Sequence, residues 1–233
     1  SVIVGANQEV KTEVNLDYLK ENGIDLVRRV TGGGAVYHDF GNLNYTIVGN
    51  SENLEKDYPE YAGWMAQALQ SLGVPATLSG RNDILVEGRK VSGFAKRVCK
   101  TRLMVHGTLM YDVDIETLTK ALNPSSIKLQ SKGIASVRSR VANLKEYLAD
   151  FQDIHSFKNR LEQILSRNYE DQEYILNNQD LESIRQLAEE KFAQKNWIYR
   201  HAPKATYHNS AHWPWGNIQV HMDIASGKIT SCR

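Results

Sequence analysis

Apolar residues along this chain follow two periods, one typical of strands and one typical of helices. Apolar and β-branched runs bounded by turn residues predict strands at residues 2–5, 24–30, 43–48, 83–87, 89–98 and 102–111. Apolar residues at helical spacing, with capping and stop signals, predict helices at residues 15–21, 57–72 and 114–122. The Glu87-Gly88 pair separates two of these strands and predicts a hairpin turn. Elements in this order indicate an α+β fold.

The last third of the chain is more helical and more charged. Two helices are expected there from apolar residues at helical spacing, namely Ile154, Phe157, Leu161 and Leu165 in the first and Leu181, Ile184, Leu187 and Phe192 in the second. Pro, His and Asn residues after Trp197 predict a linker at about residues 199–211. Apolar and polar residues alternate over residues 218–224, and Ser226-Gly227 follows as a turn signal, so we predict a hairpin. We therefore expect one domain at residues 1–200 and a linker with a hairpin at residues 201–233.

Composition places the chain among ordinary globular proteins, with 41% hydrophobic and 24% charged residues in 233. Its 28 basic and 27 acidic residues give a net charge of +1, which does not indicate nucleic acid binding. Only Cys99 and Cys232 occur, too few for a disulfide framework or a CxxC metal site, so we expect a reducing, cytoplasmic location. No stretch approaches the roughly 20 apolar residues that span a membrane, and SVIVGANQEV does not fit a signal peptide.

A run of three glycines, Gly32, Gly33 and Gly34, lies at the centre of the stretch RRVTGGGAVYHDFGN at residues 28–42. Glycines weaken strands and helices, but they let the backbone approach a ligand closely and offer several N–H groups to an anion. The stretch contains neither GxxxxGK[ST] nor a properly spaced GxGxxG. Three glycines alone favour an ordinary turn in a β protein, and the charged neighbours shift the balance towards an anion-binding loop.

Neighbouring charged residues in this stretch cannot all face one pocket. Successive strand side chains point to opposite faces, so we expect one of Arg28 and Arg29 to be structural. For the same reason His38 and Asp39 are not expected to form a catalytic dyad. We interpret His38 as a wall of the site.

A second glycine-flanked motif, GRKVSG at residues 88–93, carries Lys90 on a predicted strand. Taken alone, such a lysine is far more often a solvated hairpin residue than a ligand. Beside a glycine-rich loop it could hold a phosphate as a compact charge. Just before this hairpin, Asp83 could hold Mg²⁺ or orient a nucleotide, and a turn-capping role after Gly80 is nearly as good an interpretation.

Four blocks together resemble the lipoate-protein ligase A family. They are RRVTGGGAVYHDFGN, RNDILVEGRKVSGFAKR, HGTL and SKGIASVRSRVANL, in the family's order and at similar spacing over more than half of the chain. The resemblance implies activation of lipoate with ATP to lipoyl-AMP and pyrophosphate, with transfer of the lipoyl group to an acceptor lysine. It also implies a mixed, largely antiparallel sheet flanked by helices, with a C-terminal accessory domain beginning near residue 201 and further elements ahead of the first strand.

The resemblance also implies roles for individual residues. Lys90 would contact the phosphate and carbonyl of the adenylate as the catalytic residue. The residues implied to bind the lipoyl-adenylate are Arg29, Gly32, Gly33, Gly34, His38, Asn42, Asn82, Asp83, Ser92, Gly93, His106 and Thr108. Asp83 would also take Mg²⁺. Without the resemblance, His106 would more often be a core histidine. A basic loop such as residues 131–143, which contains Lys132, Arg138 and Arg140, would more often be a solvated face. In the family the corresponding loop covers the adenylate.

Acceptors implied by the resemblance are lipoyl domains of 2-oxoacid dehydrogenases and the glycine-cleavage H protein. These domains tend to be acidic, so we expect docking through basic residues such as Arg97, Lys100 and Arg102. The resemblance implies neither a membrane nor a nucleic acid partner. The lipoyl tail is expected to lie in an apolar tunnel whose walls the sequence does not name.

Three alternatives stay open at this point. An acyltransferase of the same fold would use a cysteine thioester, but the region VPATLSGRND contains no cysteine and Cys99 lies beyond Lys90. A non-catalytic module that binds lipoate or lipoyl domains would not require the nucleotide side of the site. Biotin ligases are related but carry a different loop signature. His201, His208 and His212 have a spacing that fits no familiar metal site and are expected at the surface.

Overall fold

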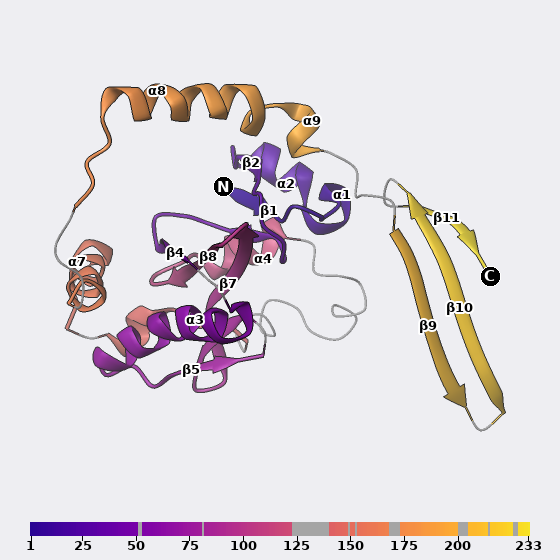
Figure 1. Ribbon diagram of the computed structural model, residues 1–233, viewed down its shortest axis with the longest axis horizontal. Coiled ribbons are helices and arrows are strands. Elements are labelled where there is room, and N and C mark those ends of the chain that lie inside the picture. Colours follow the sequence, from indigo (N-terminus) through magenta and orange to yellow (C-terminus); the bar gives the residue numbers. More distant parts are fainter. Residues whose placement is uncertain are drawn as a thin grey trace.

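The computed structural model describes residues 1–50, 53–80, 82–122, 140–148, 150–151, 153–167, 173–199, 205–213, 215–225 and 228–233. Within these ranges the chain forms an α+β fold, which confirms the predicted class (Figure 1). Its strands are divided among a five-stranded sheet, a small mixed sheet and a separate C-terminal sheet. None of the helices in the described part of the chain is long and apolar enough to cross a membrane.

The five-stranded sheet is antiparallel throughout and has the order β4-β8-β7-β6-β5. Its strands are β4 (Asn42–Asn50), β5 (Ala76–Ser79), β6 (Asp83–Val86), β7 (Arg89–Cys99) and β8 (Arg102–Met110). Glu87 and Gly88 both have positive φ, 51° and 77°, which is the geometry of a two-residue hairpin turn. The predicted hairpin is therefore confirmed, whereas β5 was not predicted.

One face of this sheet carries the main core. Helix α3 (Leu54–Ser71), the short η1 (Leu144–Tyr147) and helix α7 (Ile154–Leu165) cover this face. Fully buried residues from the sheet and these helices include Met65, Leu69, Leu103, Leu109 and Phe157. Because strand side chains alternate, the residues between these core positions on β4, β7 and β8 point to the opposite face. That opposite face is where the candidate site lies.

The small mixed sheet has the order β2-β1-β3 and forms a second core with three short helices. Strand β1 (Val2–Val4) runs parallel to β2 (Leu26–Arg28) and antiparallel to β3 (Val36–Tyr37). Helices α1 (Val10–Glu13), α2 (Leu16–Glu21) and α4 (Ile115–Ala121) pack beside it. Asn15 and Asp114 cap α2 and α4 with their side chains. The glycine-rich stretch connects β2 to β3.

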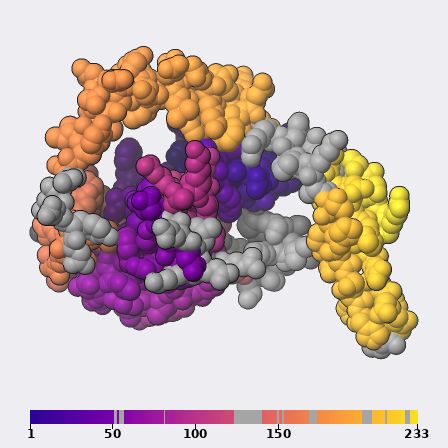
Figure 2. Space-filling model, viewed as in Figure 1, coloured from indigo at the N-terminus to yellow at the C-terminus, as the bar shows by residue number. Residues whose placement is uncertain are grey.

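A helical arch follows α7 and returns to the small sheet (Figure 1). It contains α8 (Asn178–Leu187), η2 (Ala188–Phe192) and α9 (Lys195–Ile198). Figure 2 shows an opening between the arch and the body of the molecule. The arch ends at β2, where Trp197 Nε1 donates a 2.9 Å hydrogen bond to the Arg28 carbonyl.

The C-terminal sheet has the order β11-β10-β9 and stands apart from the rest of the fold in Figure 1. Its strands are β9 (Ala205–Trp213), β10 (Gly216–Ala225) and β11 (Lys228–Cys232). The predicted linker at residues 199–211 was wrong from Ala205 onwards, because polar residues of β9 are held in register by β10. His208 and His212 are exposed on β9, whereas His201 and the predicted Ser226-Gly227 turn lie outside the described residues.

Candidate active site

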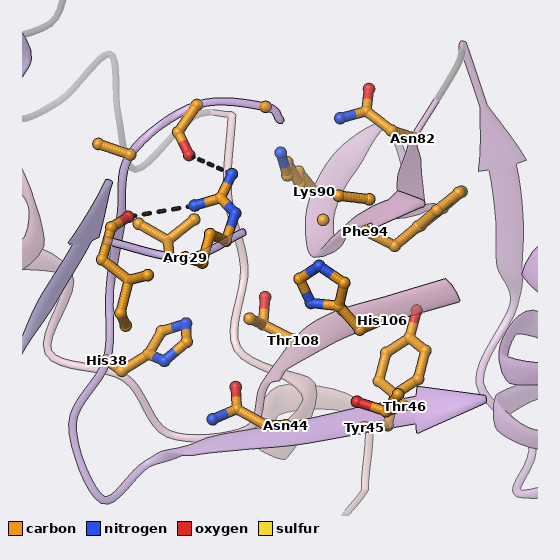
Figure 3. Close-up of a pocket in the computed structure, with 18 residues that line it drawn as sticks. Arg29, His38, Asn44, Tyr45, Thr46, Asn82, Lys90, Phe94, His106 and Thr108 are labelled. Atoms are coloured by element: carbon orange, nitrogen blue, oxygen red, sulfur yellow. Dashed lines mark hydrogen bonds between the residues drawn. The ribbon is translucent and has the colours of Figure 1, made fainter. Parts of the chain in front are cut away.

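A cavity of about 350 Å³ lies between the glycine-rich stretch and the open face of the five-stranded sheet (Figure 3). The residues that line it come from β1, from the segment between β2 and β4, from the turn just before β6, and from β4, β7 and β8. They are Ile3, Arg29, Gly33, Gly34, Ala35, Val36, His38, Asn44, Tyr45, Thr46, Asn82, Lys90, Gly93, Phe94, Ala95, His106, Gly107 and Thr108.

Arg29 holds the glycine-rich stretch in shape. Its Nη2 donates to the carbonyls of Gly32 and Gly34 at 2.7 and 2.8 Å, and its Nη1 donates to the Ile3 carbonyl at 3.2 Å. Its Nε donates to Thr31 Oγ1 at 3.1 Å. Burial lowers the pKa of Arg29 below its usual value, yet a guanidinium stays charged because that value is so high. Arg29 therefore draws two glycine carbonyls towards itself and brings positive charge to the cavity wall.

Two glycines permit this arrangement by close approach. A Cβ on Gly5 would lie 2.2 Å from the Gly33 carbonyl oxygen and 3.2 Å from Arg29 Nη2. Gly33 has φ +94°, and a Cβ there would lie 2.9 Å from Arg29 Nη2. L-residues with side chains rarely adopt such a φ. A glycine is therefore required at position 33, both for its backbone conformation and for the space around it. Gly5 is also needed for this close approach, and sequence reasoning did not identify it.

Arg28 points away from the cavity and is 1% exposed. Its Nε donates to the carbonyls of Trp197 and Ile198 at 3.1 and 2.9 Å, and its Nη1 donates to the carbonyl of Gly5 at 2.7 Å. It joins β2, the β1–α1 turn and α9. The consecutive arginines therefore face opposite sides, as the strand alternation predicts.

Lys90 reaches the cavity from the start of β7. Its Nζ lies 2.8 Å from Asp83 Oδ1 on the neighbouring strand β6, and Figure 3 shows it across the cavity from Arg29. The lysine side chain crosses Gly93, where a Cβ would lie 3.0 Å from Nζ. The Lys90 N–H donates to the Arg140 carbonyl at 2.7 Å. Lys90 is therefore an ion-paired residue of the cavity and not a free lysine of the hairpin.

His106 on β8 is linked to the glycine-rich stretch through Thr31. Thr31 Oγ1 and His106 Nε2 are 2.7 Å apart, and Thr31 is 3% exposed. Burial first, and then the charge of Arg29, lower the pKa of His106. The ring is thus held neutral at the centre of the cavity wall.

His38 lines the cavity, and Asp39 does not pair with it. Asp39 Oδ1 accepts from the Gly41 N–H at 2.9 Å and Oδ2 accepts from the Asp114 N–H at 2.8 Å. The predicted absence of a His-Asp dyad agrees with this geometry. Burial, followed by nearby positive charges that include Arg29, lowers the pKa of His38 to about 4. His38 is therefore a neutral wall residue at neutral pH.

The structure brings most of the predicted site residues to one cavity. Those that line it are Arg29, Gly33, Gly34, His38, Asn82, Lys90, Gly93, His106 and Thr108. Four predicted residues do not line it. Gly32 contributes its carbonyl to Arg29, and Asn42 donates to Asn44 Oδ1 at 2.9 Å. Asp83 pairs with Lys90 at 2.8 Å, and Ser92 is fully buried in the sheet.

Sequence reasoning missed several residues of the cavity, chiefly from the open face of β4 and β7. Asn44 and Thr46 enter because β4 pairs with β8, opposite Thr108 and His106. Tyr45 passes across Gly107, where a Cβ would lie 2.6 Å from its hydroxyl. Alternation along residues 42–50 could have indicated Asn44 and Thr46 as one face, but only the register with β8 shows which face meets the site.

Other candidate features of the sequence do not enter this cavity. Cys99 is exposed at the far end of β7 from Lys90. Nine residues of strand correspond to roughly 30 Å. Among the described residues, no three His, Cys, Asp or Glu side chains are placed to hold a metal ion. Lys132 and Arg138 of the predicted covering loop lie outside the described residues.

Comparison with known proteins identifies the class. Residues 1–166 match the family profile described as the lipoyl protein ligase A/B catalytic domain, and the chain belongs to this family. It is 42% identical to lipoate-protein ligase LplJ of Bacillus subtilis, over 100% of this chain and 72% of that protein. It is 41% identical to lipoate–protein ligase 1 of Staphylococcus aureus, over 98% of this chain and 70% of that protein.

Solved structures of lipoate-protein ligases share the fold. The bipartite ligase of Thermoplasma acidophilum, studied with its E2 lipoyl domain, has a TM-score of 0.75 at 30% identity, over 85% of this chain and 79% of that chain. A lipoate-protein ligase A bound with ATP has a TM-score of 0.73 at 29% identity, over 85% and 81% of the two chains. A putative T. acidophilum ligase with bound lipoic acid has a TM-score of 0.71 at 29% identity, with the same coverage.

Proposed function

We propose that this chain is an ATP-dependent lipoate-protein ligase, which activates lipoate to lipoyl-AMP and transfers the lipoyl group to a lysine of an acceptor domain. The observation that carries this proposal is the placement of Lys90 and the Arg29-held glycine-rich stretch on opposite sides of one cavity. Relatives of known structure that hold ATP or lipoic acid support both substrates.

In the first step, a carboxylate oxygen of lipoate attacks the α-phosphorus of ATP and the bond to pyrophosphate breaks. Two anions must approach each other, so positive charge at the cavity wall lowers the barrier. Lys90 and Arg29 supply that charge from opposite sides. Backbone N–H groups of the glycine-rich stretch are suited to phosphate oxygens, because glycine allows close approach.

In the second step, the acceptor amine attacks the acyl carbon of lipoyl-AMP. Negative charge develops on the acyl oxygen, an amide bond forms, and AMP leaves while the amine loses a proton. A cation already held in place can stabilise that oxygen without reorganisation. The 2.8 Å ion pair with Asp83 holds Lys90 in position before substrates bind.

Mg²⁺ fits this site as a companion of the nucleotide. Magnesium is commonly held by one or two carboxylates together with substrate phosphates, and Asp83 supplies a carboxylate beside the cavity lysine. We infer that Asp83 would hold the ion. Bound there, the ion would offset phosphate charge.

Lipoate ligases act on lipoyl acceptor domains, and we infer that the acceptors here are those of 2-oxoacid dehydrogenases and the glycine-cleavage H protein. The open face of the sheet continues from the cavity to the β7–β8 turn, because Ala95 pairs with His106 and Arg97 with Met104 on that same face. Arg97, Lys100 and Arg102 are exposed at that end. An acidic acceptor could therefore dock there while its lysine reaches the cavity.

Charge reversal tests this docking surface. The double variant Arg97→Glu and Arg102→Glu should raise the KM for the acceptor domain at least tenfold, because like charges across an interface cost several kcal/mol. Pyrophosphate release should stay as in wild type, since neither residue lines the cavity. An unchanged acceptor KM would exclude this surface.

We also propose that residues 1–200 form the catalytic domain and that residues 201–233 belong to an accessory unit. The separate β9–β11 sheet supports this division. We further infer a cytoplasmic location, which two exposed free cysteines, Cys99 and Cys232, favour.

Pyrophosphate release from ATP, measured with and without lipoate, tests the proposed function. Release should depend on lipoate, and Lys90→Ala should lower it by roughly 10²–10³-fold, as expected for loss of a preorganised electrostatic group. Lys100→Ala, which removes a basic residue from the β7–β8 turn, is the matched control. Cys99→Ser tests for thioester chemistry. Near-normal release by Lys90→Ala, or loss of acyl transfer in Cys99→Ser, would contradict the proposal.

A further inference from the structure

A buried hydroxyl connects the two sides of the cavity. Thr31 Oγ1 accepts a hydrogen bond from Arg29 Nε at 3.1 Å and lies 2.7 Å from His106 Nε2. Thr31 is 3% exposed and does not line the cavity itself. It lies 75 residues from His106 in the chain. Thr31 thus bridges Arg29 and His106, two residues that do line the cavity, which suggests a role for Thr31 in arranging them.

Donor chemistry fixes the direction of the bond from Arg29, and the bond to His106 then has two possible directions. An arginine can only donate, so the Thr31 oxygen accepts from Arg29. The Thr31 oxygen keeps one lone pair and its hydroxyl proton, and we assign that proton to His106 Nε2, which lies 2.7 Å away. A neutral imidazole has one nitrogen that accepts and one that carries a proton. An Nε2 atom that accepts therefore places the ring proton on Nδ1.

Charge around the ring favours this neutral form. The lowered pKa of His106, caused by burial and then by Arg29, keeps imidazolium from forming at neutral pH. Among the described residues, the other charged or titratable groups at the cavity are His38 and Tyr45, which are both held neutral, and Lys90 with Asp83. The positive charges of Arg29 and Lys90 would both oppose a further positive charge on the His106 ring.

We propose that Thr31 is a positioning residue that fixes the tautomer of His106, so that the His106 Nδ1–H group is presented to the substrate as a hydrogen-bond donor. The proposal rests on the proposed function for the identity of that substrate, an acyl-adenylate. Arg29 sets the orientation of the Thr31 hydroxyl, Thr31 sets the tautomer of the ring, and the ring donates to an oxygen of the adenylate. Among the described residues, the His106 side chain forms its hydrogen bond through Nε2, to Thr31.

The tautomer can be measured directly, whether or not the chain proves to be a ligase. Protein labelled with ¹⁵N-histidine should show, for His106, a protonated Nδ1 and an unprotonated Nε2 at neutral pH. The seven histidines require assignment, which the loss of one signal pair in His106→Gln provides. A protonated Nε2 in the wild-type protein would overturn the proposal. The same protein failing to release pyrophosphate would instead refute the proposed function and leave the tautomer result standing.

Two variants of Thr31 separate the hydroxyl from the shape of the side chain. Thr31→Val keeps the shape and removes the hydroxyl, while Thr31→Ser keeps the hydroxyl. We expect Thr31→Val to lose roughly 10- to 100-fold in kcat/KM for lipoate-dependent pyrophosphate release, the usual consequence of leaving buried polar partners unsatisfied, and to show a mixed His106 tautomer. Thr31→Ser should retain the wild-type tautomer and stay within about threefold of wild-type activity.

The outcomes of these variants decide the matter even if Thr31→Val folds poorly. A folded Thr31→Val protein with wild-type activity, or a Thr31→Ser protein that has lost the tautomer, would overturn the proposal. Should Thr31→Val not fold, a pair of His106 variants tests the proposal in its place. The amide nitrogen of His106→Asn can take the place of Nδ1, and that of His106→Gln the place of Nε2, so the Asn variant should retain more activity. Higher activity of His106→Gln would contradict a donor role for Nδ1.

Discussion

The five-stranded sheet and the C-terminal sheet are both antiparallel, but their faces have very different surroundings. In the five-stranded sheet one face is covered by α3 and α7, with Leu103 and Leu109 fully buried, and the other face lines the cavity. In the C-terminal sheet, Ile218 and Ile229 are 39% and 60% exposed. Alternation of side chains defines a strand in both, whereas burial depends on which other elements lie against it.

Polar groups differ between the two regions in the same way. Around the cavity, Arg28, Arg29 and Thr31 are buried or half-buried, and their hydrogen bonds join segments far apart in the chain. In the C-terminal sheet, the described side-chain hydrogen bonds join neighbouring strands, such as His208 to His221. Buried polar networks are costly to disrupt, and exposed pairs contribute little. Variants in the two regions should therefore differ widely in effect.

The largest effect on stability is expected at Arg28. Arg28→Met would leave several buried carbonyls without a donor, so the free energy of unfolding should fall by about 3 kcal/mol or more. Urea denaturation would measure it. Arg29→Met is the matched neighbour, and it should lose lipoate-dependent pyrophosphate release with a smaller loss of stability because Arg29 is less buried. Equal destabilisation by both variants would contradict the division of roles between the arginines.

Gly5→Ala should have the next largest effect. The added Cβ would lie 2.2 Å from the Gly33 carbonyl oxygen, so the glycine-rich stretch must shift. Overpacking of this kind costs about 1–3 kcal/mol, and displacement of the stretch should lower pyrophosphate release. Gly32→Ala is the control for stability, because a Cβ there meets nothing within 4 Å. A Gly5→Ala protein as stable and as active as wild type would show that the stretch adapts.

Acid should weaken the cavity region through His38. Its pKa of about 4 in the folded state lies below the ordinary 6.5, so the unfolded chain takes up the proton first as the pH falls. Stability is therefore unaffected above about pH 7 and declines from about pH 6.5 towards pH 4. Between pH 7.5 and pH 5 the loss should be roughly 1–2 kcal/mol. Urea unfolding at several pH values would measure it, and His38→Gln should lose most of this component. An identical pH dependence in that variant would exclude His38 as its source.

The smallest effect is expected in the C-terminal sheet. The rings of Trp213 and Trp215 stack with centroids 6.3 Å apart, but both are exposed. Trp213→Ser should change the unfolding of the catalytic domain by less than about 0.5 kcal/mol and leave pyrophosphate release unchanged. A marked loss of release would mean that this sheet acts on the cavity.

Local patterns predicted much of the fold and part of the site. Strand β4, the β6–β7 hairpin, β8, α3 and α4 follow from hydrophobic period, turn residues and caps, all of which act within a few residues. Opposite placement of Arg28 and Arg29 follows from alternation alone. Strand β9 was missed because its polar residues carry no clear period and its pairing with β10 decides its conformation. The requirement at Gly5 and the Thr31–His106 contact arise from tertiary approach, for which a single sequence contains no local signal.

The bond between Trp197 and Arg28 also has a consequence for biosynthesis. The Trp197 indole and the Arg28 carbonyl are separated by 169 residues, and the Arg28 side chain binds the Trp197 and Ile198 carbonyls as well. On a ribosome, β2 can therefore not acquire its final partners until Ile198 has left the exit tunnel. The strand that leads into the glycine-rich stretch must therefore remain without its final partners while the next 169 residues are synthesised.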